Sequence, residues 1–161
     1  MIKANIEEII ELSLSKLGCD YVHGSMGPNT FDCAGFAWYV YNYLYNINIF
    51  EGGYGLSTTT MIMTSNYGIL TLFNNNLELI KKGDIVLLHR QSKKDNEPRV
   101  DNKYPGHCGI YLGDNYFIHA SGSTRNVVIN SFDEEYWKSI LVGSKHIIED
   151  NKILKKVEKT T

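Results

Sequence analysis

Residues 31–47 read FDCAGFAWYVYNYLYNI, and apolar side chains recur through them at three- and four-residue spacing. This periodicity predicts a buried helix over residues 33–47. Asp32 directly precedes the pattern and is well suited to cap that helix, because an aspartate accepts hydrogen bonds from the unpaired N–H groups at a helix start. Cys33 is therefore predicted on the first turn of a buried helix.

A cysteine at this position has an unusual environment. The unpaired N–H groups and the positive end of the helix dipole stabilise a thiolate, so the thiol is partly ionised near neutral pH. Gly35 has no side chain and would let a substrate approach the backbone, where N–H groups can hold an oxyanion. The alternative role for Cys33 is that of a small buried hydrophobic residue. A base close to Cys33 would favour the first role.

Two histidines, His107 and His119, lie on predicted neighbouring strands, and the loop between the strands decides whether they share a face. A two-residue loop pairs Cys108 with His119 and sends His107 to the opposite face. A three-residue loop pairs Gly109 with His119, which makes the two histidines diagonal neighbours roughly 7 Å apart at the backbone. Only the second register supplies a base, His107, with an orienting partner, as nucleophilic catalysis requires.

The rest of the chain divides into a helical first part and a strand-rich second part. An amphipathic pattern predicts a helix over residues 5–17, and a stretch rich in Gly, Ser, Pro and Asn predicts a loop at 21–30. A short helix is predicted near 59–67 and a long polar loop at 91–106. The predicted strands cover residues 85–88, 107–112, 116–120, 126–130 and 145–148. Helices followed by an antiparallel meander indicate an α+β fold.

Length and composition fit one domain. The chain has 161 residues, of which 43% are hydrophobic and 21% are charged, and this is enough apolar material for one core. We place the domain at residues 1–148 and a polar tail or linker stub at residues 149–161. Three cysteines at irregular spacing do not form the pattern of a disulfide framework.

The charge balance excludes some classes of partner. Sixteen basic residues stand against eighteen acidic ones, for a net charge of −2, which does not fit a broadly basic nucleic-acid binder. No apolar stretch approaches the ~20 residues that span a bilayer, so we expect no membrane insertion. The first eight residues carry charges where a secretory signal would be apolar, so we expect no export signal in this chain.

Four separated motifs carry a resemblance to a known family. They are FDCAGF at 31–36, GDIV at 83–86, HCGIYLG at 107–113 and FIHA at 117–120. In order and spacing they resemble the NlpC-type cell-wall cysteine peptidases, over about Gly18 to Phe132. The resemblance implies a papain-like fold in circularly rearranged order, with N-terminal helices packed on a central antiparallel sheet.

The resemblance also implies roles for single residues. Cys33 would be the nucleophile, His107 the base that takes its proton, and His119 the residue that orients His107. The substrate would be bacterial peptidoglycan or muropeptides, cleaved in the stem peptide at the bond between D-isoglutamate and the diamino acid. The residues expected to bind this substrate are Tyr21, Asp32, Ala34 and Gly35. We expect a monomer with no metal and no cofactor, because covalent thiol catalysis needs neither.

Some residues depart from the family pattern. Ala34 stands where the family commonly has a serine, so a hydroxyl that would contact the substrate is missing. Cys108 replaces the usual valine, and we expect it to be a packed thiol that points away from the face of His107. His23 lies in the loop before the nucleophile, either at the rim of the cleft or simply in solvent. Tyr54 and the threonines at 58–60 receive no assigned role.

Three other functions remain in view. An N-acetylmuramoyl-L-alanine amidase would use the same cysteine and histidines on a different bond. A zinc module would need Cys33, Cys108, His107 and His119 to share one ion, although positions 107 and 108 point to opposite strand faces. A non-catalytic wall-binding domain would lack a reactive thiol. The settings that fit are a phage-type endolysin, a cytoplasmic enzyme, and an excised domain of a secreted protein, with a wall-binding module beyond the C-terminus.

Overall fold

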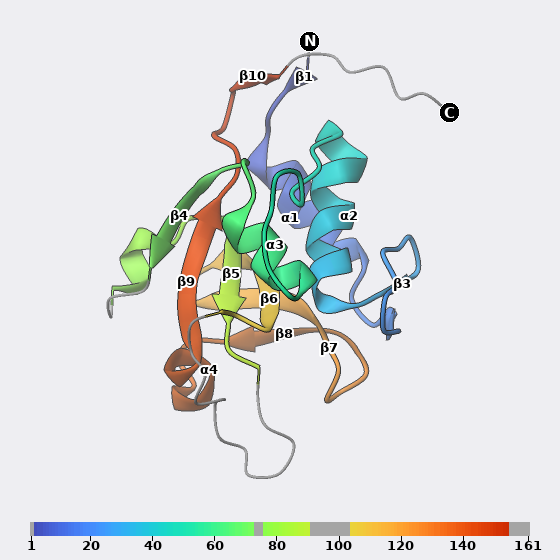
Figure 1. The fold of residues 1–161 in the computed structure, drawn as a ribbon, viewed down its shortest axis with the longest axis vertical. Helices are drawn as coiled ribbons and strands as arrows, with labels where there is room; N and C mark the ends of the chain where they lie inside the picture. The colour runs from blue at the N-terminus through green and yellow to red at the C-terminus, as the bar shows by residue number, and fades with distance from the viewer. Residues whose placement is uncertain (1, 73–75, 91–103, 155–161) are drawn as a thin grey trace.

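A computed structural model describes residues 2–72, 76–90 and 104–154 of the protein. Its centre is an eight-stranded sheet in the order β3-β2-β8-β7-β6-β5-β9-β4 (Figure 1). Each pair of neighbouring strands is antiparallel except β2 and β3, which are parallel. The strands are β2 Asp20–Tyr21, β3 Thr30–Phe31, β4 Ile69–Leu72, β5 Ile85–Leu88, β6 His107–Gly113, β7 Tyr116–Ser121, β8 Asn126–Ser131 and β9 Leu141–His146. The predicted α+β class with a central antiparallel sheet is confirmed.

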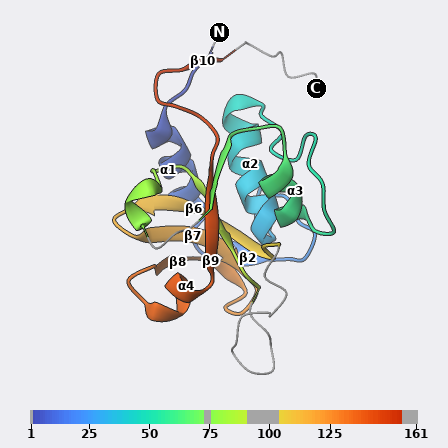
Figure 2. The ribbon, with the colours of Figure 1, turned by 60° about the vertical axis from the view of Figure 1, so that its left-hand side comes forward.

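The helices divide between two cores on the two faces of this sheet. The larger core joins α1 (Ile6–Ser15), α2 (Cys33–Tyr45) and α3 (Thr58–Thr64) to one face of the sheet. The smaller core joins α4 (Glu135–Ser139) to the other face. Figure 2 shows α2 and α3 on one side of the strands, with α4 well apart from them. The alternation of side chains along each strand therefore decides which core a residue enters.

The helix α2 carries the nucleophile candidate and is fixed at both ends. The carboxylate of its N-cap, Asp32, accepts a hydrogen bond from the N–H of Gly35 at 2.6 Å, as predicted from the sequence. The hydroxyl of Tyr41 donates to the carbonyl oxygen of Gly83, directly before β5. The helix ends at Tyr45, two residues before the predicted end, because Asn46 adopts the left-handed conformation at φ 54°.

The hairpin of β6 and β7 has the register that puts both histidines on one face. Ile110 pairs with Ile118, so the continuation of this register sets Gly109 opposite His119. A Cβ at Gly109 would stand 3.0 Å from the Cβ of His119, so only glycine fits there.

The loop of this hairpin differs from both alternatives that the sequence offered. Asp114 and Asn115 form a two-residue turn with φ of 51° and 69°, and Gly113 pairs with Tyr116. An irregularity between Tyr111 and Gly113 then restores the register that a three-residue loop would give. The register needed for two histidines on one face is therefore present, although a bulge rather than loop length produces it.

Several predicted boundaries were wrong. The last long strand covers Leu141–His146 rather than residues 145–148, and the helix predicted at 59–67 is α3 at Thr58–Thr64. Ile147 and Ile148 are buried, but they fill the larger core beyond the end of β9. Of the long polar loop predicted at 91–106, residues 91–103 lie outside the described part of the chain.

Some elements were not predicted at all. The short strands β1 (Ile2–Lys3) and β10 (Ile153–Leu154) pair with each other at the end of the molecule opposite α4 (Figure 1). The edge strand β4, the helix α4 and a 3₁₀ turn, η1 (Leu77–Leu79), are likewise new. The start of the predicted tail is thus paired with the N-terminal segment, whereas residues 155–161 lie outside the described chain. None of the described helices is both long and apolar enough to cross a membrane.

Candidate active site

The structure places Cys33 at the first position of α2, half-buried and not joined in a disulfide. The loop before the helix is tied to the helix start, because the other carboxylate oxygen of Asp32 accepts from the N–H of Gly24 at 3.0 Å. A Cβ at position 35 would stand 2.2 Å from the carbonyl oxygen of Ser25. Gly35 is therefore required by the close approach of the chain's own loop, whereas the sequence suggested the approach of a substrate.

His107 and His119 form a hydrogen-bonded pair on the face of the sheet that bears α4. Nε2 of His107 lies 2.6 Å from Nδ1 of His119. The second ring nitrogen of His119, Nε2, lies 2.7 Å from Oδ1 of Asn130 on β8. The two histidines thus make the contact that the hairpin register predicted, and Asn130 extends it by one residue.

The environment of His119 keeps its ring neutral. The side chain is fully buried, and the rings of Phe117 and Trp137 lie 4.7 Å and 5.1 Å from its own. Burial above all, and then the charge of His107, lower the pKa of His119 to about 3. His119 is therefore uncharged near neutral pH.

The surroundings of Cys33 favour its thiolate. A hydrogen bond from the Cys108 thiol, and then the hydrogen bond and charge of His107, hold the pKa of Cys33 well below its ordinary value despite burial. Because Nε2 of His107 contacts His119, Nδ1 is the nitrogen left for Cys33. The structure thus brings together Cys33, His107 and His119, the three residues that the motifs single out.

Cys108 and Thr59 complete the immediate surroundings of the sulfur. The Oγ1 atom of Thr59, on α3, lies 3.8 Å from Sγ of Cys33 and 4.0 Å from Sγ of Cys108. Cys108 is fully buried in the larger core, and its hydrogen bond to Cys33 together with burial raises the pKa of its thiol. Cys108 is indeed a packed thiol, but its contact with Cys33 was not foreseen.

The expected substrate-binding residues around Cys33 differ in how far they are buried. Tyr21 on β2 is half-buried, and burial followed by the nearby charges of Cys33 and Asp32 raises the pKa of its hydroxyl. Ala34 is fully buried in the larger core, backbone included, so it is not exposed to a substrate as the sequence suggested. His23 is exposed and close enough to Asp32 for its charge to affect that carboxylate.

The sequence offered no sign of the roles of Asn130, Thr59 and Cys108. Asn130 lies on the face of His119 because Phe117 pairs with Asn130, and residues 117 and 119 share a face. Only the pairing of β7 with β8 reveals this. Thr59 belongs to a run of threonines in the sequence, but only the packing of α3 on α2 places it beside Cys33.

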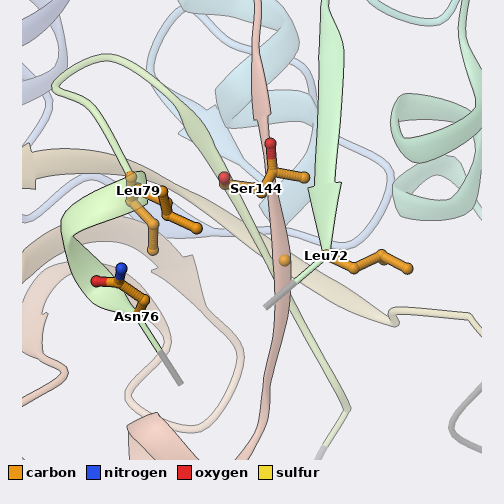
Figure 3. Close-up of a pocket in the computed structure, with 7 residues that line it drawn as sticks. Leu72, Asn76, Leu79 and Ser144 are labelled. Atoms are coloured by element: carbon orange, nitrogen blue, oxygen red, sulfur yellow. The ribbon is translucent and has the colours of Figure 1, made fainter. Parts of the chain in front are cut away.

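The described residues form no metal-binding cluster beside this site, and one hollow lies away from it. The described ranges hold no group of three or more His, Cys, Asp or Glu side chains arranged to bind a metal ion. Figure 3 shows a hollow between η1 and strands β4 and β9, lined by residues that include Leu72, Leu79 and Ser144. It encloses about 190 Å³, part of which is open solvent, and none of the residues around Cys33 lines it.

Comparison with known protein families agrees with the motifs that form this site. A sequence model of the NlpC/P60 family matches residues 18–146. The chain belongs to the NlpC/P60 family. This finding confirms the resemblance to NlpC-type cysteine peptidases that the four motifs carry.

Individual NlpC/P60 proteins are similar over most of this chain. It is 28% identical over 152 residues to the probable endopeptidase YafL of Escherichia coli K12, covering 93% of this chain and 53% of YafL. It is 28% identical over 141 residues to the probable peptidoglycan endopeptidase LytE of Bacillus subtilis 168, covering 88% of this chain and 34% of LytE. The solved structure of NlpC2 from Trichomonas vaginalis superposes with a TM-score of 0.63 at 28% identity, covering 91% of this chain and 49% of that one.

The similarity thus covers nearly all of this chain but only part of those relatives. The chain spans about half the length of YafL and about a third of LytE.

Proposed function

We propose that this chain is a cysteine endopeptidase that hydrolyses the stem peptides of bacterial peptidoglycan. The observation that carries the proposal is the contact series from the Cys33 sulfur through His107 to His119, with the lowered pKa of Cys33. A thiolate beside an imidazole, itself held by a third group, is the arrangement that nucleophilic catalysis of acyl transfer requires. The names of YafL and LytE, both probable endopeptidases, support the same reaction class.

The proposed reaction proceeds through an acyl-enzyme. The Cys33 thiolate attacks the scissile carbonyl carbon, and the carbonyl electrons move to oxygen. When this tetrahedral intermediate collapses, the C–N bond breaks and the His107 imidazolium gives its proton to the leaving amine. His107, now neutral, takes a proton from a water molecule that attacks the thioester. Collapse of the second intermediate expels the Cys33 thiolate beside the His107 imidazolium and releases the product as a carboxylic acid, which loses its proton to solvent.

The start of α2 offers few N–H groups to the developing oxyanion. The N–H of Gly35 is held by the Asp32 carboxylate, and the N–H of Phe36 donates to the Asp32 carbonyl oxygen at 2.9 Å. Ala34 is fully buried, so among the first four residues of α2 this leaves the backbone of Cys33 for the oxyanion. We propose that the Cys33 N–H supplies electrostatic stabilisation, which typically contributes several kcal/mol to such reactions.

We further propose that the cleaved bond joins D-isoglutamate to the diamino acid. The groups beside Cys33 that suit a peptide amine are the Asp32 carboxylate and the Tyr21 hydroxyl. Both lie close enough to Cys33 for its charge to affect their pKa values. A free amine on the substrate would find a negative charge at Asp32, one residue before the nucleophile.

The test is digestion of purified sacculi followed by mass spectrometry of the soluble products. The wild-type protein is expected to release fragments with new free amino termini on the diamino acid. Cys33→Ala should release none while keeping the circular dichroism spectrum of the wild type. Release of lactyl groups freed from L-alanine would instead identify an amidase. No cleavage by the wild type on any wall type would overturn the proposal in favour of a binding domain.

A further inference from the structure

A third side chain continues the contact between His107 and His119. Asn130 lies on β8, and its Oδ1 atom is 2.7 Å from Nε2 of His119. On its other side, His119 contacts His107 through Nδ1 at 2.6 Å. Because β7 pairs Phe117 with Asn130, the amide reaches His119 across one diagonal of the sheet. Asn130 is half-buried and its amide oxygen is hydrogen-bonded to His119, so its effect on the nucleophile passes through the histidines.

The amide oxygen of Asn130 determines which ring nitrogens of His119 and His107 carry protons. A neutral imidazole has one N–H donor and one acceptor nitrogen, and an amide oxygen only accepts. Facing the oxygen of Asn130, Nε2 of His119 must carry the proton, and Nδ1 is then the acceptor. Nδ1 in turn accepts the Nε2 proton of His107. The nitrogen of His107 that is left for Cys33, Nδ1, is consequently unprotonated and free to take the thiol proton.

The reverse arrangement would disable the base. If the amide nitrogen of Asn130 faced His119, it would donate to Nε2, and the proton of His119 would move to Nδ1. That proton would point at Nε2 of His107, so the proton of neutral His107 would sit on Nδ1, towards Cys33. The resulting His107 could not accept the thiol proton, and its imidazolium would meet an N–H where it needs an acceptor.

We propose that Asn130 is a positioning residue that selects the Nε2–H tautomer of His119 and thereby makes His107 a base. This inference rests on the proposed peptidase function but concerns a residue outside the three that the family motifs mark. The burial of His119 makes the selection effective, because its ring remains neutral and has a single proton to place. Solvent does not reach the fully buried ring to offer an alternative acceptor.

The first experiment reads the tautomer directly, without substrate. The ring ¹⁵N chemical shifts of His119, assigned with a His119→Gln variant, are expected to show a protonated Nε2 and an unprotonated Nδ1 in the wild type. Asn130→Leu, which has a similar shape and no acceptor, should lose this preference. A protonated Nδ1 in the wild type would overturn the proposal whatever the protein hydrolyses.

The second experiment separates an acceptor from a donor at position 130. Asn130→Leu is expected to lower kcat by roughly tenfold or more, with little change in KM, because the imidazolium of His107 loses an oriented acceptor. The alkaline limb of its pH–rate profile should move to lower pH. Asn130→Asp keeps the acceptor oxygen and lacks any donor, so it should restore most of the lost rate and move the alkaline limb to higher pH.

The controls keep the outcome clear. Ile129→Ala changes an exposed neighbour on the same strand and should behave as the wild type. If Asn130→Asp is as impaired as Asn130→Leu, or if Asn130→Leu keeps the wild-type rate and pH profile, the proposal is wrong. If Asn130→Leu fails to fold, the tautomer of the wild type and the activity of Asn130→Asp still decide. Absence of hydrolysis by the wild type would count against the proposed function alone, since the tautomer is measured independently.

Discussion

At the scale of single residues, two thiols share one site but differ in chemical state. Cys33 and Cys108 both contact the hydroxyl of Thr59, yet the pKa of Cys33 is lowered and that of Cys108 is raised. The difference arises first from the hydrogen bond between the two thiols, which favours the thiolate of Cys33 and disfavours that of Cys108. His107 further favours the thiolate of Cys33, and burial further disfavours that of Cys108. Cys108 is therefore placed to donate a hydrogen bond to the Cys33 thiolate.

Alkylation should distinguish the three cysteines. Iodoacetamide at neutral pH is expected to label Cys33 well before Cys19 and Cys108, because the thiolate is the nucleophile and Cys108 is inaccessible. Peptide mapping after timed quenching would measure the three rates. Equal labelling of all three cysteines in the folded protein would contradict an activated thiol at position 33.

Removal of the Cys108 thiol should shift the pH dependence of the enzyme. Cys108→Val deletes a hydrogen bond to the Cys33 thiolate, so the pKa of Cys33 rises and the acidic limb of kcat/KM moves to higher pH. At acidic pH the rate should fall by about fivefold, as expected for a hydrogen bond of about 1 kcal/mol. Cys108→Ser retains a donor, so its acidic limb should lie between those of the wild type and Cys108→Val. An unchanged acidic limb in Cys108→Val would show that Cys108 only packs.

At the scale of elements, the position of α3 depends on a buried lysine. Lys145 on β9 is only 2% exposed, and its amine donates to the carbonyl oxygens of Ile62 and Ser65 at 2.7 Å and 2.8 Å. It also donates to the hydroxyl of Ser65 at 2.7 Å. The Ile62 carbonyl also accepts from the N–H and the hydroxyl of Ser65, so the lysine adds a charged donor to a helix end that is already capped. Because α3 carries Thr59, Lys145 supports the site from the opposite end of that helix.

Substitution of Lys145 should loosen α3. Lys145→Met keeps the aliphatic stem but removes the charged donor that the Ile62 and Ser65 carbonyl groups and the Ser65 hydroxyl share, so the free energy of unfolding should fall by about 1–3 kcal/mol. Hydrolysis should fall as well, since Thr59 would no longer be held beside Cys33. Denaturant titration would measure the stability, with the exposed Lys138→Met on α4 as the matched control. A stability equal to that control would show that α3 does not need this lysine.

At the scale of the whole molecule, His146 joins three parts of the chain. Its Nδ1 lies 2.6 Å from Asp84, directly before β5, and its Nε2 lies 2.7 Å from Glu149 on the way to β10. Burial lowers the pKa of His146, but the hydrogen bonds and charges of Asp84 and Glu149 outweigh it, and the pKa is raised above the ordinary 6.5. The folded protein therefore binds this proton more tightly than the unfolded chain does.

The sign of the pH dependence follows from that difference. The stabilisation by His146 is fully present below pH 6.5 and is lost as the pH rises through the raised pKa. A partly exposed pair of this kind contributes about 1 kcal/mol or less, so Tm should fall by about 2–4 °C between pH 6 and pH 8 on this account. In His146→Gln, the fall of Tm between pH 6 and pH 8 should be smaller by that amount. An equal decrease of Tm in both proteins would contradict the assignment.

The chemistry of the site and the class of the fold were accessible from local sequence. The 3.6-residue period after Asp32 indicates α2, and the apolar runs around the turn at 113–115 indicate two strands, because these patterns report which face is buried. A capping aspartate followed by cysteine fixes the thiol at a helix start. The likeness of four spaced motifs then indicated the family.

Tertiary structure alone decided which residues meet at the site. A shift of one residue in the strand pairing would move a side chain to the opposite face of the sheet. The bulge near Leu112 sets this pairing, and the local sequence does not reveal the bulge. Asn130, Thr59 and Cys108 come close to Cys33 and the two histidines only through strand pairing and helix packing across long stretches of chain. Local periodicity indicates the helices and strands, because it reports which face of each is buried. Contacts between distant segments depend on how those elements pack, and local sequence patterns do not reveal that packing.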